Sequence, residues 1–120
     1  MNDPEGGHAS GRTEDVGVTL AGALETAAEA LDPPPTVQTT DGVTNWSVAG
    51  QPIVSLSAAT AAFRVGPDIG AAARKTPDAG DSPLGQEWVA FSPSSLDEHA
   101  VDRLTAWFAA AHRRACSVTQ

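Results

Sequence analysis

The sequence predicts a small α+β domain: an antiparallel sheet of four to five strands, with an N-terminal helix, a short helix and a long C-terminal helix packed on it. Three observations predict this class: an apolar stripe at helical spacing near the start, alternating apolar and polar residues interrupted by turn signals, and a longer helical stripe near the end. The chain has 120 residues, enough for one domain with its own core. We expect residues 1–16, polar and glycine-rich, to be a disordered tail and residues 17–117 to form the domain.

Residues 18–32, VTLAGALETAAEALD, are expected to form the first helix. Glu25 and Glu29 fall on its polar side. Prolines 33–35 should end it, because proline lacks a backbone donor and restricts the residue before it. The apolar side, at spacings of three and four, consists of Leu20, Leu24, Ala27, Ala28 and Leu31.

Between residues 36 and 65 the sequence predicts three or four short antiparallel strands. Valine, threonine and aromatic residues dominate this stretch, and turn signals such as Asp41-Gly42 and Gly66-Pro67 interrupt or end it. In NWSVAG and AAFRVG apolar residues alternate with others, so one sheet face should be buried and the other partly wet. A further strand is expected in QEWVAFSP, residues 86–93. Both of its faces are apolar, which predicts a central strand covered on both sides, with Trp88 in the core.

Two more helices and a loop complete the expected order. A short helix should follow Gly66-Pro67, with Asp68 as its N-cap. Prolines and glycines without periodicity then predict a mobile loop over residues 76–87, of a length that is often functional. The long helix should run from Leu96 to about Cys116. Its apolar stripe consists of Ala100, Leu104, Trp107, Phe108, Ala111 and Ala115.

The densest chemistry lies in WVAFSPSSLDEHA, residues 88–100. Ser95 stands three residues before Glu98, the pattern of a capping box, so we interpret this stretch as a helix start rather than a catalytic site. Removing Ser95 should then cost about 1 kcal/mol. Arg113 and Arg114, near the other end, are expected to complement the helix dipole.

Charge and composition narrow the function classes. The formal net charge is −8, which argues against nucleic-acid binding because such binding depends on Lys and Arg at phosphates. The sequence has no apolar stretch of membrane-spanning length and no signal-peptide core, so we expect a cytoplasmic protein without membrane contact. The single cysteine and the three scattered histidines predict no metal site, and we expect no cofactor.

No nucleophile is paired with an evident base, so we predict no catalytic residues and favour a binding protein over an enzyme. The leading hypothesis is a non-enzymatic protein-binding or adaptor module. It would contact another protein, or a second copy of itself, through a sheet face or the loop over 76–87. One alternative is a secretion-type chaperone, which is suggested by the size, the acidity and the element order of the chain.

The second hypothesis is a small anionic-ligand binding protein, or a modest enzyme, with a pocket between the strands and the terminal helix. Arg64 would hold the anion through its planar guanidinium, and His99 would move a proton. Trp46 or Trp88 would form a wall of this pocket. The competing interpretation of Arg64, which we favour, is a solvated strand residue paired with a surface acid.

Two sequence words resemble those of the MmcQ/YjbR-like family of small bacterial α+β proteins. They are AAFRVG at 61–66 and GQEWVAFSP at 85–93, followed by LDEHAVDRLTAWFAAAHRRA, and the resemblance covers roughly residues 18–115. It implies the α+β fold. Members are mostly of unknown function, and their fold has suggested DNA binding, from which the acidic charge of this chain departs. The resemblance implies no catalytic residues.

Overall fold

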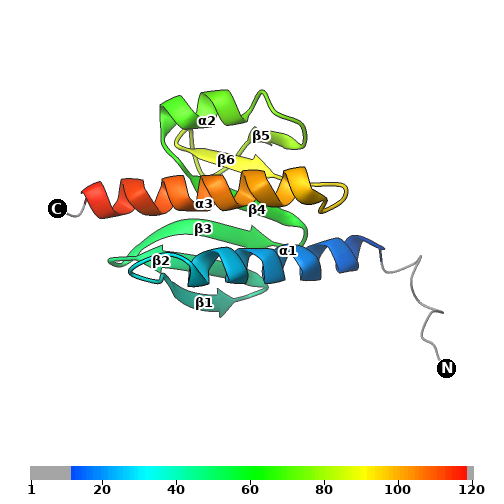
Figure 1. Ribbon diagram of the computed structural model, residues 1–120, viewed down its shortest axis with the longest axis horizontal. Coiled ribbons are helices and arrows are strands. Elements are labelled where there is room, and N and C mark those ends of the chain that lie inside the picture. The colour runs from blue at the N-terminus through cyan, green and yellow to red at the C-terminus, as the bar shows by residue number, and fades with distance from the viewer. Residues whose placement is uncertain (1–11, 119–120) are drawn as a thin grey trace.

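The computed structural model describes residues 12–118, and the side chains of residues 19–117. This part of the chain forms three helices and one antiparallel sheet of six strands, in the order β1-β2-β3-β4-β6-β5 (Figure 1). The α+β class is confirmed, and the sheet has one strand more than the upper end of the prediction. Residues 1–11 of the expected tail lie outside the described residues.

The strands are β1 (Thr36–Thr40), β2 (Val43–Val48), β3 (Gln51–Ser57), β4 (Thr60–Arg64), β5 (Ala79–Asp81) and β6 (Trp88–Phe91). The helices are α1 (Arg12–Glu29), α2 (Pro67–Ala73) and α3 (Glu98–Val118). The predicted meander corresponds to β1 to β4. The additional strand β5 lies in the expected loop, where three residues are too few to show alternation. Helix α1 begins at Arg12, before the expected residue 18. The prediction missed its first turns, RTEDVG, because they carry no apolar stripe that periodicity could reveal.

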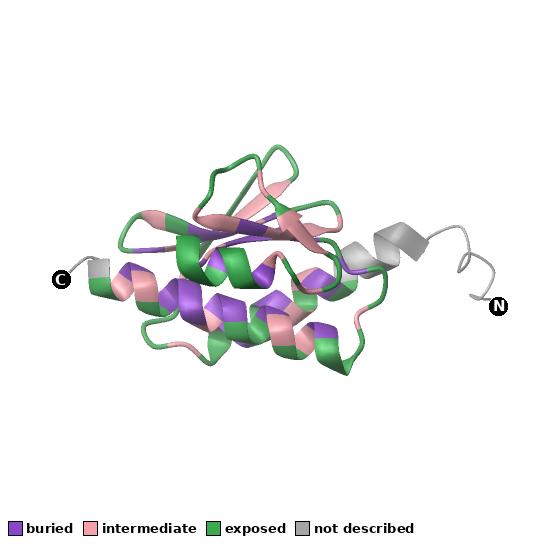
Figure 2. Cartoon of the chain, turned by 90° about the horizontal axis from the view of Figure 1, so that it is seen from above, coloured by how far each residue is buried: buried purple, intermediate pink, exposed green. Residues whose placement is uncertain are grey.

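The helices all lie on one side of the sheet. Helices α1 and α3 contact each other and run across the same face, and α2 contacts β6 on that side (Figures 1 and 2). In the described part of the chain no helix covers the opposite face, so the sheet has one buried and one open side. The partly wet face that the strand alternation predicts is therefore confirmed.

The core is built by aromatic rings between the sheet and α3. Phe63 of β4 contacts Trp107 and Phe108, with ring centroids 5.9 and 6.4 Å apart. Phe91 of β6 meets Trp107 edge-on at 5.2 Å. The predicted α3 stripe is buried along its whole length, and the predicted α1 stripe is buried except for the partly buried Leu31.

The expectation that β6 is covered on both faces is wrong. Val89 and Phe91 are buried, but Trp88 and Ala90 are only half-buried. Strand β6 is paired on both edges, by β4 and β5, which agrees with a central position. Its second face is open because both long helices pack on the other side of the sheet. Trp88 is therefore not a core residue.

A buried histidine connects α3 to the segment after α1. His112 is 6% exposed, and its Nε2 donates a hydrogen bond to the carbonyl oxygen of Pro33 at 2.8 Å. This contact fixes the chain just before β1 against α3. The sequence predicts Arg113 and Arg114 near the end of this helix, but α3 continues to Val118 and has no basic residue in its last turn.

The two predicted helix caps are wrong. The amide of Ala100 donates to Asp97 Oδ1 at 2.8 Å, and α3 begins at Glu98, so Asp97 rather than Ser95 is the N-cap. Helix α2 has Gly66 at its N-cap, with φ of 96° and no side-chain cap, while Asp68 lies in the first turn. Neighbouring polar residues are equally good caps by composition, and the backbone path decides between them.

We predict that Asp97→Ala lowers the free energy of unfolding by about 1 kcal/mol, because it removes a side-chain cap from α3. Ser95→Ala is the control, since it truncates an exposed neighbouring side chain outside the helix and should change stability little. Urea unfolding followed by circular dichroism measures both. Equal losses in the two variants would contradict the assignment of the cap to Asp97.

Candidate binding site beside Arg64 and Trp88

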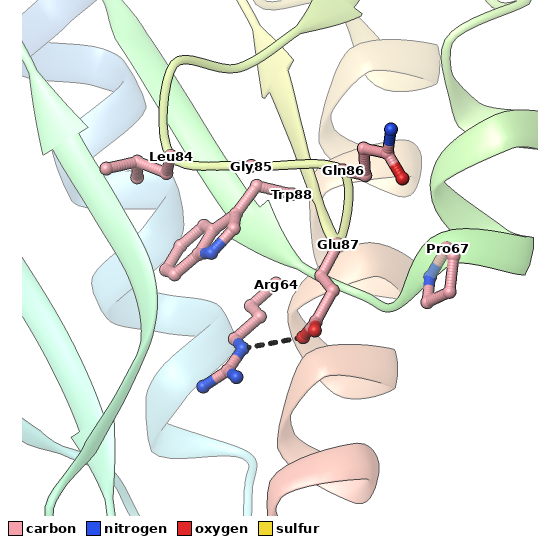
Figure 3. Close-up of a pocket in the computed structure, with 7 residues that line it drawn as sticks. All are labelled: Arg64, Pro67, Leu84, Gly85, Gln86, Glu87 and Trp88. Atoms are coloured by element: carbon pink, nitrogen blue, oxygen red, sulfur yellow. Dashed lines mark hydrogen bonds and ion pairs between the residues drawn. The ribbon is translucent and has the colours of Figure 1, made fainter.

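A cavity of about 420 Å³ opens where the end of β4 meets the start of β6 and the loop before it (Figure 3). Strand pairing places Arg64 opposite Trp88. The cavity thus brings together two of the four predicted binding residues, from neighbouring strands. Its lining consists of Arg64, Pro67, Leu84, Gly85, Gln86, Glu87 and Trp88.

One carboxylate joins two arginines at this cavity. Glu87 Oε1 accepts a hydrogen bond from Arg64 Nε at 3.0 Å and lies 3.0 Å from Nη2 of Arg114 on α3. The side chains of both arginines are 32% exposed, and that of Glu87 is 41% exposed. The interpretation of Arg64 as a strand residue paired with a surface acid is therefore confirmed.

The two arginines also set the protonation of Glu87. Its pKa lies below the ordinary carboxyl value, first because Arg64 donates a hydrogen bond to it and next because Arg114 brings a positive charge close. Desolvation acts in the opposite direction and is weaker than these effects together. Glu87 is therefore ionised at neutral pH and is a poor proton donor.

The segment from β5 to β6 is held by arginines from three different elements. Besides Arg64 and Arg114, Arg74 lies 3.3 Å from Asp81 Oδ1 through its Nε, and its Nη1 donates to the carbonyl of Trp88 at 3.2 Å. Sequence reasoning missed both residues: Arg114 was assigned to the helix dipole, and Arg74 stands in a second basic doublet, Arg74-Lys75, near the end of the short helix. The doublets were the signal, but nothing local shows that their partners lie in the loop.

Gly66 lets the Arg114 side chain approach the site. A Cβ at this position would lie 2.9 Å from Arg114 Nε, closer than non-bonded atoms tolerate, and the φ of 96° is in the region that favours glycine. The amide of Gly66 also donates to the carbonyl of Glu87 at 2.9 Å. The turn between β4 and α2 thus supports the ion pairs of Glu87.

The other two predicted site residues lie elsewhere. His99 is exposed in the first turn of α3 and does not line the cavity. Trp46 is 1% exposed, packs edge-on against Phe108 at 6.0 Å, and lines a different hollow between α1 and β1. The expected pocket between the strands and the terminal helix, with Arg64, His99 and one of the two tryptophans around it, is wrong, because aromatic packing fills that space.

The described residues contain no group of three or more histidine, cysteine, aspartate or glutamate side chains that could hold a metal ion. Within the same part of the chain, no helix combines the length and the apolar character needed to cross a membrane.

Comparison of the chain with protein families, with curated proteins and with solved structures gave no match. The resemblance to the MmcQ/YjbR-like proteins therefore stays a prediction.

We predict that Glu87→Gln destabilises the protein at neutral pH and that the difference from the unmodified chain shrinks as the pH falls below 4.5, the ordinary value for this carboxyl. A group whose pKa is lowered by folding stabilises the folded state above its unfolded pKa, and this contribution is lost as the pH falls through the folded value. Urea unfolding at a series of pH values measures the difference. Glu25→Gln, on the exposed side of α1, is the control, and a pH-independent effect of Glu87→Gln would contradict the assigned interaction.

Proposed function

We propose that this protein is a non-enzymatic protein-binding or adaptor module that uses its sheet as the binding surface. The observation that carries the proposal is the exposure of β1, in which all five residues are exposed at one edge of the sheet. An edge strand offers unpaired backbone groups to another chain.

The open face of the sheet extends this surface inward from β1. The strand register aligns small and polar residues across it, and apart from the buried Ala62 they are exposed or half-buried. This row carries no charged side chain, which suits contact with a protein better than contact with a nucleic acid. The aligned residues are Gln38, Asn45, Ser55, Ala62 and Ala90.

The cavity beside Arg64 also supports binding over catalysis. Its carboxylate is held by two arginines, and the described residues that line it include no histidine, cysteine, serine or lysine. A nucleophile with an adjacent base, the usual requirement for covalent catalysis, is therefore missing from that lining.

The test of the protein-binding function is site-specific photo-crosslinking in the native host, with a photo-crosslinking amino acid at position 38 or 90 on the open face. We expect a crosslink to one partner protein. Native mass spectra of the gently purified protein should show the same partner at a fixed stoichiometry. Position 113, exposed on α3, is the control and should give no such product. A bare monomer together with no crosslinks at positions 38 and 90 would contradict the proposal.

A secretion-type chaperone is one form that such a module could take, with an unfolded client as its partner. Protection of that client from aggregation is its test.

A second candidate function is binding of a small anion, and the observation that favours it is the contact of two arginines with one carboxylate oxygen beside Trp88. A ligand carboxylate or phosphate would replace Glu87 at Arg64, and the half-buried indole would form a wall (Figure 3).

We predict that benzoate, used as the probe, shifts the indole N–H signal of Trp88 in NMR spectra. The shift should saturate at lower benzoate concentration in Glu87→Gln, which removes the internal competitor, and should be lost in Arg64→Ala. Arg113→Ala is the matched control, because it removes an exposed arginine from another face of α3. Equal affinity in Arg64→Ala and the unmodified chain would overturn this candidate.

A further inference from the structure

We propose that β1 is the docking edge for an extended, basic segment of another protein, which adds to the sheet as a seventh strand. This inference rests on the proposed protein-binding function and specifies its partner class and its binding mode. Five observations carry it: the character of the two sheet edges, the direction of the β1 backbone groups, a groove beside β1, the buried tryptophan that lines this groove, and the charge around it.

The two edges of the sheet differ in how well they are protected. Strand β5 has three residues and carries Asp81, which pairs with Arg74. Strand β1 has five residues, TVQTT, without a charge or a proline. Natural sheets protect their edges by shortness, charge or proline. Strand β1 has none of these protections, so it is the edge at which another strand can pair.

The hairpin between β1 and β2 decides which backbone groups point outward. Asp41 and Gly42 form a two-residue turn with φ of 53° and 80°, so Thr40 and Val43 form the hydrogen-bonded pair that closes it. Hydrogen-bonded pairs alternate along an antiparallel ladder, so Gln38 also bonds toward β2. The N–H and C=O groups of the residues between, Val37 and Thr39, therefore point away from β2 and are available to an incoming strand.

A mostly apolar groove of about 360 Å³ lies between α1 and β1. Val37 is 55% exposed there, an unusual position for a large apolar side chain. A strand paired with β1 would place every second side chain on the groove side, beside Val37. The groove is lined by Glu25, Ala28, Glu29, Pro34, Pro35, Val37 and Trp46.

Trp46, whose side chain lines the groove, is 1% exposed, and its indole N–H has no hydrogen-bond partner within the described part of the chain. A buried donor without an acceptor lowers the stability of the folded chain. An occupant of the groove would contact this ring and change the surroundings of its N–H.

Charge specifies the occupant. Glu25 and Glu29 are exposed at the groove, the described residues that line it include no lysine or arginine, and the chain carries a net charge of −8. A segment that alternates apolar residues with Lys or Arg complements both features. A second copy of this chain does not, because two-fold pairing of β1 strands would bring Glu25 and Glu29 close to the same residues of the other copy.

The test uses the ¹⁵N-labelled full chain and two synthetic peptides of about nine residues, long enough to span β1, one alternating Val with Lys and the other Val with Glu. We expect the Lys peptide to bind saturably and the Glu peptide at least about tenfold more weakly. Binding should slow amide exchange at Val37 and Thr39 but not at Gln38, which is already bonded to β2, and should move the Trp46 indole N–H signal.

Two variants make the test specific. Thr39→Pro removes one outward N–H without removing a bond to β2, so binding should fall at least about tenfold while the unfolding transition remains. Glu25→Lys should weaken binding of the Lys peptide more than Asp102→Lys, which makes the same charge change at an exposed position of α3.

The outcomes separate this inference from the proposed function. No binding of the Lys peptide, or binding that leaves the amides of Val37 and Thr39 unprotected, would overturn strand addition at β1. A host protein crosslinked at position 90 but not at position 38 would also overturn it, while the protein-binding function would stand. The absence of a host partner at both positions would count against the function itself, whatever the peptides do.

Discussion

The packing of α3 onto the sheet through Phe63, Trp107 and Phe108 is the contact on which the rest of the structure depends. Each large apolar side chain buried in this way contributes about 1.5–3 kcal/mol, and these three lie at the centre of one continuous core. Because α1 packs beside α3, both long helices cover the same face of the sheet (Figure 2). The opposite face and the edge at β1 are therefore left without a covering helix in the described structure.

Electrostatic contacts order the segment that the core does not reach. Residues 82–87 have no regular secondary structure, yet Arg74 and Arg64 hold the ends of this segment through Asp81 and Glu87. Arg114 connects the second of these pairs to α3. The chain is strongly acidic overall, but three of its few basic residues meet here. At the cavity beside Trp88, two arginines thus contact one carboxylate.

Local sequence patterns predicted most of the fold. Both helical stripes and the four-strand meander could be predicted because each repeats its pattern of apolar residues over many positions. Strand β5 and the cap at Asp97 were missed, since a three-residue strand and a choice between neighbouring polar residues leave no periodic signal. Two of the four predicted binding residues, Arg64 and Trp88, lie side by side because they are on paired strands. The positions of His99 and Trp46 depend on how α3 packs across the sheet, which no local pattern encodes.

The central claim is that the exposed sheet edge binds another protein. Hydrogen–deuterium exchange at single-residue resolution, on the free chain and on the complex isolated from the native host, tests it most directly. The account predicts that β1 exchanges in an alternating pattern in the free chain, fast at Val37 and Thr39 and slow at Gln38, and that the complex protects all three. Unchanged exchange at Val37 and Thr39 in the complex would contradict it.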